Sequence, residues 1–427
     1  MKILVVGGGG REHAIIRKIK ENPAVDEIYA LPGNAGIARD AVCVNIRATD
    51  IDGIVEFAKG HPVDFAVVAP DDPLALGCVD RLHALGIPCF GPDAKAARIE
   101  ASKVFAKNLM KKYGIPTAAY EVFDDPRAAL AYVKSAKLPL VVKADGLALG
   151  KGVVICENRE QAEEAVVAAM EERVFGASGA RIVVEEFLEG PEVSVLAFTD
   201  GKVVKPMVSS MDHKRVGDGD VGPNTGGMGT IAPNPFYTAK VAERCMNEIF
   251  LPTIAAMNAE GCPFKGCLYF GLMVTRDGPK VIEYNCRFGD PETQVVLPLL
   301  KSDLLTIMMA VENGTLADTP VEFSEGAACC AMLASGGYPG KYEKGKVIDL
   351  GEAEAMAQVF HSGTARNAAG ELITAGGRVL GVSCTADDLK TAVQRAYAAA
   401  DQVKWEGMIR RRDIGRRALD ILNNEVK

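Results

Sequence analysis

The sequence has little of the positive charge that a nucleic-acid-binding protein needs. Its 427 residues carry 48 Lys and Arg against 56 Asp and Glu, a formal net charge of -8. Sequence-independent binding of nucleic acid requires a clustered excess of Lys and Arg. The one basic cluster, 410–417, is short, and we interpret it as a solvated helix end or an intramolecular ion-pair partner rather than a substrate contact. We therefore expect no nucleic-acid partner.

Long apolar runs are also absent. Only four consecutive apolar residues precede the glycines at 7–10, too few for the core of a signal peptide, and no run reaches the length of a membrane span. No internal repeat, low-complexity tract or long linker divides the chain. We expect a soluble, cytoplasmic protein without a membrane partner.

The eleven cysteines include no C-x-x-C pair. Cys329 and Cys330 are adjacent, and Cys43, Cys89 and Cys156 lie inside apolar runs. Cysteines with this distribution act as small core hydrophobes in a reducing compartment. We therefore expect buried, unpaired thiols and no disulfide framework.

The N-terminal part of the chain alternates short apolar runs with helical patterns. Amphipathic stretches such as 12–21 and 51–59 separate the runs KILVV, DEIYAL, AVCVNI, DFAVVAP and IPCFG. This alternation predicts a parallel sheet with helices on both faces. Ligands of such sheets bind beyond the carboxyl ends of the strands, where the turns 7–10, 32–36 and 70–73 would gather.

Later segments alternate less regularly and predict an α+β region. A helix is expected over 102–113, capped by Ser102 and ended by Gly114. Two strands between 266 and 284 should form a hairpin. Further strands are expected at 138–144, 153–156, 181–187 and 192–198, the last two as a strand and its return strand. Residues from about 327 should form a last unit of short strands and one long helix, 387–403.

Two polar segments carry the strongest indication of chemistry. The segment 212–229, DHKRVGDGDVGPNTGGMG, has hardly any apolar surface, so we expect a loop that buries almost nothing. In EYNCRFGDPE, Glu283 and Asn285 lie two residues apart and share one face of a strand. A carboxylate and an amide oxygen are hard ligands suited to Mg²⁺. Arg287 would neutralise an anion bridged by that metal, which predicts a Mg-nucleotide phosphoryl-transfer site; an exposed strand end is the alternative.

The N-terminal glycines do not form a dinucleotide fingerprint. Glu12 and His13 occupy the places where a third glycine is needed, and no acidic residue ends the second strand. What remains is a strand, a glycine turn at 7–10 and a helix whose free N–H groups suit a monophosphate or another small anion. A purely structural turn stays the alternative.

The turn DGLALGKG at 145–152 is not a P-loop, because Asp145 and Gly152 stand where glycine and Ser or Thr are required. Lys143 and Lys151 suit a flexible hairpin that closes over a triphosphate, but a surface hairpin with solvated lysines fits equally well. In 181–192, RIVVEEFLEGPE, the backbone could bind an adenine edge and Glu192 the ribose hydroxyls. A solvated glutamate is the usual alternative.

We interpret His213 as a hydrogen-bonding loop residue rather than an acid or base. We interpret Met207, Met211 and Met228 as packing residues.

These motifs together resemble one enzyme family. GGGGREHA (7–14), PGNAG (32–36), KADGLALGKG (143–152), EEFLEGPEVS (185–194) and the two polar segments above, in this order and spacing, are similar to the phosphoribosylamine–glycine ligase family of the ATP-grasp superfamily. The resemblance runs over essentially the whole chain, into 374–380 and 412–415. Two departures are Asp71-Asp72, where the family usually has Glu-Ala, and Met211 in place of a common Gln.

The resemblance implies an α/β and α+β architecture with three domains. These are an N-terminal doubly wound substrate-binding domain (1–101), a central ATP-grasp domain (102–326, with a mobile lid at about 120–190), and a small C-terminal α+β domain (327–427). It also implies a reaction, in which glycine and 5-phosphoribosylamine are joined at the expense of ATP in purine biosynthesis, with Mg²⁺ or Mn²⁺ as cofactor and a monomer as the expected state.

The resemblance also implies roles for individual residues. Arg287 and Lys143 would be catalytic, and Glu283 and Asn285 would bind the metal. The ATP-binding residues would be Lys107, Lys143, Gly146, Gly150, Lys151, Gly152, Glu185, Glu186, Leu188 and Glu192. The substrate-binding residues would be Gly8, Gly9, Gly10, Asn34, Asp212, Lys214, Asn224, Thr225, Gly226, Gly227, Arg287, Asp290 and Glu292. No histidine is expected to be catalytic.

Three alternative functions remain open at this point. The nearest is another ATP-grasp ligase or a carboxylase of the purine pathway, against which the segment 212–229 argues. A nicotinamide-dependent dehydrogenase would predict binding of a nicotinamide cofactor. A non-enzymatic nucleotide-sensing module would predict ATP binding without turnover.

Overall fold

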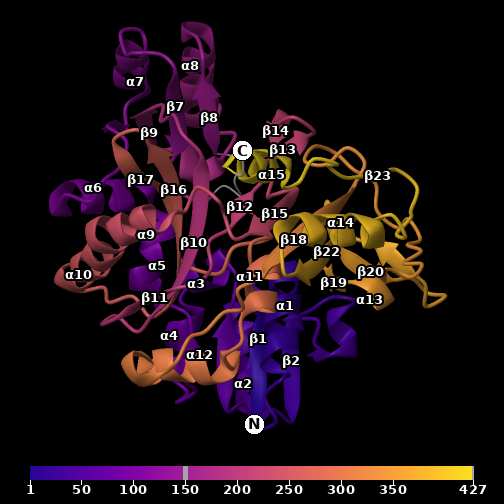
Figure 1. The fold of residues 1–427 in the computed structure, drawn as a ribbon. Coiled ribbons are helices and arrows are strands. Elements are labelled where there is room, and N and C mark those ends of the chain that lie inside the picture. Colours follow the sequence, from indigo (N-terminus) through magenta and orange to yellow (C-terminus); the bar gives the residue numbers. More distant parts are fainter. Residues whose placement is uncertain (148–151, 426–427) are drawn as a thin grey trace.

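Five parallel strands form the sheet at the N-terminal end of the molecule (Figure 1). The computed structural model describes residues 1–147 and 152–425. The strand order is β3 (Val42–Cys43), β2 (Glu27–Pro32), β1 (Lys2–Gly7), β4 (Phe65–Val68) and β5 (Cys89–Phe90). All neighbouring strands pair in parallel, so the predicted parallel sheet is confirmed.

Alternate residues of β1 pack into two different hydrophobic cores. Leu4 and Val6 belong to one core, whereas Ile3 and Val5 belong to the other, as expected for a strand with both faces covered. The surrounding helices are α1 (Gly10–Ile19), α2 (Ile51–Gly60), α3 (Asp71–Ala75), α4 (Cys78–His83), α5 (Ala94–Ala101) and the 3₁₀ turn η1 (Ile37–Arg39). The carboxyl ends of the strands meet as predicted, because Gly33 N–H donates to the Gly7 carbonyl at 3.2 Å.

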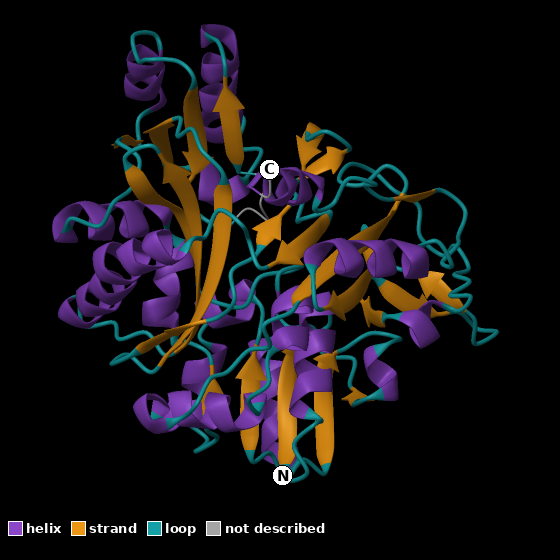
Figure 2. Ribbon diagram, in the orientation of Figure 1, coloured by secondary structure: helices purple, strands orange, loops and turns teal. Residues whose placement is uncertain are grey.

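The central sheet is antiparallel and contains β11 (Val204–Pro206), β10 (Glu192–Thr199), β16 (Gly266–Thr275) and β17 (Gly278–Asn285) in that order. β16 and β17 form the predicted hairpin. The helix before this region, α6 (Lys103–Tyr113), has its predicted caps: Ser102 Oγ accepts from Phe105 N–H, and Gly114 has a φ of 67°. Figure 2 shows helices lining this sheet. They include α9 (Ala239–Cys245), the π-helix η4 (Met246–Phe250) and α10 (Leu251–Ala259).

A second antiparallel sheet forms a unit with its own hydrophobic core. Its strands are β6 (Tyr120–Phe123), β9 (Ile182–Glu186), β7 (Leu140–Ala144) and β8 (Val153–Cys156). The elements that join them are α7 (Pro126–Val133), α8 (Arg159–Val166), the π-helix η2 (Val167–Glu171) and the 3₁₀ turn η3 (Gly176–Gly179). Figure 1 places this unit, which we call the 120–186 unit, at one end of the molecule.

The prediction that 181–187 and 192–198 form a strand and its return strand is wrong. β9 pairs with β6 and β7, whereas β10 pairs with β11 and β16 of the central sheet. Both edges of β9 are therefore occupied, and no hydrogen-bonding edge is left for β10. The connector between them instead links two sheets, with Val274 N–H donating to the Pro191 carbonyl at 3.0 Å.

The third antiparallel sheet, which we call the third sheet, draws on two distant parts of the sequence. Its order is β12 (Met211–Asp212), β15 (Gly229–Ala232), β18 (Ala327–Ser335), β22 (Arg378–Ala386) and β19 (Gln358–His361), and β23 (Met408–Ile409) pairs with β18. The last unit is therefore extended by two strands that precede residue 327. The remaining pairs are β13 (Arg215–Gly217) with β14 (Val221–Asn224), and β20 (Thr364–Arg366) with β21 (Leu372–Thr374).

Helices complete this half of the chain. They are α11 (Thr293–Leu299), α12 (Leu304–Asn313), the 3₁₀ turn η5 (Leu316–Asp318), α13 (Ala353–Met356), α14 (Leu389–Ala400) and α15 (Arg416–Glu425). α14 is the long helix predicted over 387–403, and Asp388 caps it by accepting from Thr391 N–H.

The prediction that 212–229 buries almost nothing is wrong at both ends of the segment. The tip, 218–223, is exposed, but His213 and 227–229 are buried. β15 pairs with β18, which hydrogen-bonds the polar backbone and removes the cost of burying it. Sheet pairing, rather than apolar side-chain area, buries these residues.

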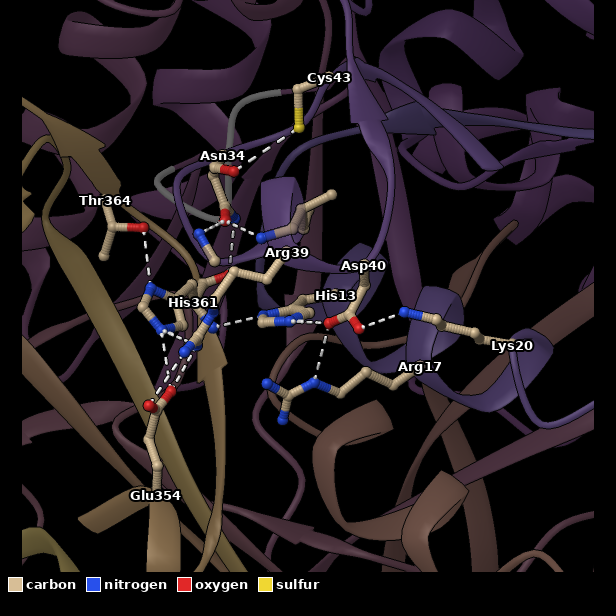
Figure 3. Close-up of polar contacts among 12 residues, drawn as sticks. His13, Arg17, Lys20, Asn34, Arg39, Asp40, Cys43, Glu354, His361 and Thr364 are labelled. Carbon is tan, nitrogen blue, oxygen red and sulfur yellow. Dashed lines mark hydrogen bonds and ion pairs between the residues drawn. The ribbon is translucent and has the colours of Figure 1, made fainter. Parts of the chain in front are cut away.

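A buried polar network joins the N-terminal sheet to the third sheet (Figure 3). The backbone N–H of His361 donates to Nδ1 of His13 at 2.9 Å. Nε2 of His13 lies 3.4 Å from Asp40, and Nε2 of His361 lies 3.1 Å from the guanidinium of Arg39. Arg39 also pairs with Glu354. Burial lowers the pKa of His13 to about 4 and the pKa of His361 to about 3, so both rings are neutral at neutral pH.

The cysteine prediction holds with one exception. Ten of the eleven cysteines are buried and all are free, but Cys43 is exposed. Cys43 lies on β3, a two-residue edge strand that pairs only with β2, so one side of it faces solvent. Among the described residues, no helix combines the length and apolarity needed to cross a bilayer.

Candidate functional site

A cavity of about 1450 Å³ is lined by the 120–186 unit, the central sheet and the third sheet. Most of the predicted site residues line it together. They are Lys107, Lys143, Gly152, Glu185, Glu186, Leu188, Glu192, Asp212, Lys214, Asn224, Thr225, Gly226, Glu283, Asn285, Arg287, Asp290 and Glu292. The chain thus brings residues more than 180 positions apart to one surface.

The other predicted residues do not line this cavity. Gly146 accepts a hydrogen bond from Lys103 Nζ at 3.0 Å, just behind the wall. Gly227 packs against a cavity residue, since an added Cβ would lie 2.7 Å from Asp212 Oδ1. Gly150 and Lys151 lie outside the described residues. Gly8, Gly9, Gly10 and Asn34 are not lining residues, although Arg11, next along the chain, lines the cavity and its N–H donates to Asp290 Oδ2 at 3.4 Å.

Two buried lysines in the cavity wall share one carboxylate. Nζ of Lys107 and Nζ of Lys143 lie 3.1 Å and 3.0 Å from the same Oε2 of Glu185. All three side chains are buried. Burial lowers the pKa of Lys107 to about 8, and the Glu185 charge opposes that shift. Oε1 of Glu185 has no partner within the described structure. The cluster carries a net positive charge that suits a polyphosphate.

The donor set predicted for the metal fits a hard cation. Glu283 and Asn285 lie at the end of β17, both lining the cavity. The amide nitrogen of Asn285 donates to Glu100 and to the Tyr284 carbonyl, which leaves its oxygen for a ligand. Burial raises the pKa of Glu283, but Lys214, Lys143 and other cations more than offset this, so its pKa lies below the ordinary value. The carboxylate is therefore ionised and ready to bind a cation.

Lys214 connects the segment 212–229 to two carboxylates of the central sheet. Its Nζ lies 3.2 Å from Glu192 and 3.5 Å from Glu283. These two carboxylates raise the pKa of Lys214 well above its usual value, with Glu192 contributing most. The residues predicted to bind ribose, metal and substrate are thus in electrostatic contact with one another.

A second pair of cavity residues, Asp212 and Glu292, are both carboxylates. Burial and the nearby Glu292 raise the pKa of Asp212 well above its usual range, and burial also raises the pKa of Glu292. Ser194 Oγ lies 3.5 Å from Glu292 Oε1 and 2.8 Å from Tyr269 OH. Like charges in one desolvated site favour a cationic ligand or a shared proton.

The third sheet supplies two cavity residues that the sequence did not single out. Arg378 Nη1 donates to the Gly226 carbonyl at 2.6 Å and to the Asp290 carbonyl at 2.7 Å. Gly226 N–H donates to Tyr338 OH at 2.9 Å. Arg378 lies within the 374–380 motif, which could have indicated it, whereas nothing in the sequence around Tyr338 distinguishes it.

The N-terminal turn is tightly built. An added Cβ on Gly8 would lie 2.4 Å from the Gly33 carbonyl oxygen, so only glycine allows the two turns to approach. Asn34 Nδ2 donates to the carbonyls of Gly8 and His361, and Oδ1 accepts from two backbone N–H groups. Glu12 accepts from Gly9 N–H at 2.6 Å. The predicted anion- and substrate-binding roles of this turn stay a prediction.

The residues interpreted as structural make internal contacts, although some of them also line the cavity, namely Met211, His213, Arg411, Arg416 and Arg417. His213 is buried between the Gly229 carbonyl and Gly415 N–H, and burial lowers its pKa to about 4. Met207, Met211 and Met228 are buried. In the basic cluster, Arg410 pairs with Asp401 and Arg411 pairs with Asp220 and Asp413.

Three family models cover most of the chain. The phosphoribosylglycinamide synthetase N domain matches residues 1–100, the ATP-grasp (A) domain of that synthetase matches 101–293, and its C domain matches 328–417. The predicted ATP-grasp fold, preceded by a parallel-sheet domain and followed by a smaller one, is therefore confirmed.

Individual relatives agree with the family models over the full length. The chain is 47% identical over 424 residues to phosphoribosylamine–glycine ligase from Vibrio vulnificus (strain CMCP6), covering 98% of this chain and 99% of that protein. It is 48% identical over 420 residues to the ligase of the same name from Rhizobium meliloti (strain 1021), covering 98% and 99%. The crystal structure of phosphoribosylamine–glycine ligase from Thermotoga maritima matches with a TM-score of 0.85 and 37% identity, covering 97% of this chain and 100% of that one. The chain belongs to the phosphoribosylglycinamide synthetase family.

Proposed function

We propose that this protein is an ATP-dependent ligase that joins glycine to 5-phosphoribosylamine in purine biosynthesis, giving glycinamide ribonucleotide, ADP and phosphate. The observation that carries the proposal is the shared cavity. Lys107, Lys143, Glu283, Asn285 and much of the segment 212–229 line it together. The full-length relatives named phosphoribosylamine–glycine ligase support the choice of substrates.

The first step activates glycine. Its carboxylate is a poor electrophile, so an oxygen of that carboxylate attacks the γ-phosphorus of ATP, the bond to the ADP oxygen breaks, and glycyl phosphate and ADP result. Such a transfer depends on positioning and charge neutralisation. Lys143 and Arg287, which both line the cavity, neutralise the transferring group. A Mg²⁺ or Mn²⁺ ion held by Glu283 and Asn285 would supply further neutralisation.

The second step forms the amide. The nitrogen of the sugar amine attacks the acyl carbon of glycyl phosphate, phosphate leaves, and the nitrogen loses one proton. An amine on an anomeric carbon is weakly basic and largely neutral near pH 7, so no strong general base is required. The five histidines agree with this, because His13, His213 and His361 make internal hydrogen bonds and neither His61 nor His83 lines the cavity.

Glycine recognition belongs to the acidic end of the cavity. Asp212 and Glu292 suit the ammonium group of glycine, because two carboxylates in one buried site gain a counter-ion when it binds. The carboxylate of glycine would then point toward Lys214 and the nucleotide. Asn224, Thr225 and Gly226 line the same end and complete the proposed substrate-binding set with Asp290.

The remaining parts of the proposal concern the whole molecule. The proposed domains are 1–101, 102–326 with a lid at about 120–190, and 327–427. Closure of that lid would keep water from glycyl phosphate. We also propose that the protein is a cytoplasmic monomer.

The test is ADP release with Mg-ATP, glycine and phosphoribosylamine made in place from ribose 5-phosphate and ammonia, omitting each component in turn. ADP that appears only with all components, together with glycinamide ribonucleotide, supports the ligase. ADP formed with a different carboxylate or amine would replace the substrates proposed here. No ADP from folded protein under any combination would overturn the enzyme assignment.

A further inference from the structure

Glu100 receives hydrogen bonds from three consecutive residues of the metal and phosphoryl motif. Its Oε1 accepts from Asn285 Nδ2 at 3.0 Å and from Arg287 Nη2 at 2.9 Å, and its Oε2 accepts from Cys286 N–H at 2.7 Å. Glu100 lies on α5, at the end of the N-terminal part of the chain, and 185 positions separate it from Asn285. One carboxylate therefore holds both groups that the proposed chemistry needs at the end of β17.

The contact decides which way the Asn285 amide faces. With Nδ2 turned to Glu100 and to the Tyr284 carbonyl, Oδ1 is left for the cavity. A flipped amide would place its oxygen against the Glu100 carboxylate, where two acceptors repel and no hydrogen bond forms. A metal ligand must be the oxygen, so Glu100 selects the orientation that binds a cation.

The same carboxylate orients Arg287. The guanidinium donates Nη2 to Glu100 and Nη1 to the Phe288 carbonyl at 3.2 Å, and its side chain is 18% exposed. A buried guanidinium held at two nitrogens presents a fixed direction to an anion. Its remaining Nε has no hydrogen-bond partner among the described residues.

Glu100 is itself fixed in place. It is 8% exposed, and α5 ends one residue later. The next residue, Ser102, donates to Asp145 Oδ1 at 2.9 Å, and Val104 N–H donates to the same oxygen at 2.8 Å. The α5–α6 junction, which directly follows Glu100, is thus hydrogen-bonded to the residue after β7.

We propose that Glu100 is a positioning residue that sets the metal-binding face of Asn285 and the direction of Arg287. This proposal rests on the function proposed above for the metal and phosphoryl site. It extends that function by giving a residue outside the 283–292 motif the role of orienting the site. Groups that orient metal ligands typically change metal affinity or activity about 10–100-fold when they are altered.

The test is Mn²⁺ binding followed by electron paramagnetic resonance in the presence of ADP, with the full chain. Glu100→Gln keeps the size of the side chain, but its NH₂ group faces donors, so it loses at least one of the three hydrogen bonds. We expect Mn²⁺ to bind roughly 10-fold or more weakly, while ADP binding in the presence of a chelator is unchanged. Glu312→Gln is the matched control, because Glu312 pairs with His83 and does not line the cavity.

Two further measurements separate positioning from general damage. The effect of Glu100→Gln on Mn²⁺ affinity should disappear in an Asn285→Ala background, because the group it orients is gone. Glu100→Asp retains the charge on a shorter stem and should give an intermediate loss, which keeps the test available if Glu100→Gln does not fold. The proposal would be overturned if Mn²⁺ affinity is unchanged in both variants, or if ADP affinity in the presence of a chelator falls as much as Mn²⁺ affinity. It would also be overturned if Glu100→Gln weakens Mn²⁺ binding just as much in the Asn285→Ala background. These readouts need no turnover, so a protein that fails to make glycinamide ribonucleotide would overturn the proposed function alone.

Discussion

The ammonium group of Lys143 lies 3.0 Å from Oε2 of Glu185, and both side chains are buried. Because Lys107 uses the same oxygen, Glu185 balances part of the positive charge that two buried lysines hold in the free protein. A triphosphate would supply the rest. This arrangement explains how two lysines can be buried together in the cavity wall when no nucleotide is bound.

Removing that carboxylate should destabilise the protein. Glu185→Gln leaves two buried ammonium groups without a charged partner, and we expect a loss of about 3–5 kcal/mol in unfolding free energy. Thermal or urea unfolding measures it. Glu186→Gln is the control, because Glu186 is the next residue on β9, is half-exposed and pairs with Lys280 at 3.5 Å. Equal stability of the two variants would contradict the structural role given to Glu185.

Arg287 should be needed for turnover but not for folding. Arg287→Gln removes the cation that is proposed to face the transferring phosphoryl group, and the rate should fall on the order of 10²–10³-fold. Glu283→Ala should likewise abolish measurable turnover, through loss of the proposed metal ligand. The unfolding midpoint shows whether each variant is folded. Arg276→Gln is a suitable control, because Arg276 is almost fully exposed at the tip of the β16–β17 hairpin. Near-normal turnover in either site variant would refute the assignment.

Arg378 should affect the substrates more than the nucleotide. Its guanidinium donates to the carbonyls of Gly226 and Asp290, so Arg378→Gln frees the backbone of two proposed substrate-binding residues. We expect KM for glycine or phosphoribosylamine to rise on the order of 10–10²-fold, with ADP binding unchanged. Arg366→Gln, at an exposed position of β20, serves as the comparison. A parallel loss of ADP affinity would show that Arg378 supports the whole cavity instead.

Acid should weaken the junction shown in Figure 3. The pKa of His13 is lowered from its ordinary value to about 4 by burial, so the unfolded chain binds a proton more readily than the folded one. Stability is therefore lost as the pH falls from about 6.5 toward 4, by about 1–2 kcal/mol per histidine between about pH 7 and pH 5. His361, whose pKa is lowered to about 3, acts in the same direction.

His13→Asn tests this linkage, because the amide oxygen replaces Nδ1 as the acceptor for the His361 N–H and cannot be protonated in this range. The difference between the unfolding midpoint at about pH 7 and that at about pH 5 should be smaller for this variant than for the parent protein. His61→Asn, at an exposed position after α2, should leave the difference unchanged. An identical pH response of parent and His13→Asn would contradict a neutral buried His13.

The local sequence determined much of this protein. Alternating apolar runs, the Ser102 and Gly114 caps and the hairpin at 276–279 depend on contacts between near neighbours, and each formed as predicted. The pair Glu283 and Asn285 also came from strand periodicity alone, since residues two apart share a face. The choice of family and reaction came from long motifs read as a set, because no single glycine turn was specific.

Only the tertiary structure decided which distant segments meet. The separation of β9 from β10, the exposure of Cys43 on an edge strand, and the pairing of β15 with β18 all depend on which hydrogen-bonding edges are free in the folded chain. Glu100 shows the same limit at the site. It lies in an ordinary helical pattern, and its role emerges only where α5 packs against the end of β17. Such contacts join residues far apart in the sequence, so no local pattern of side chains encodes them.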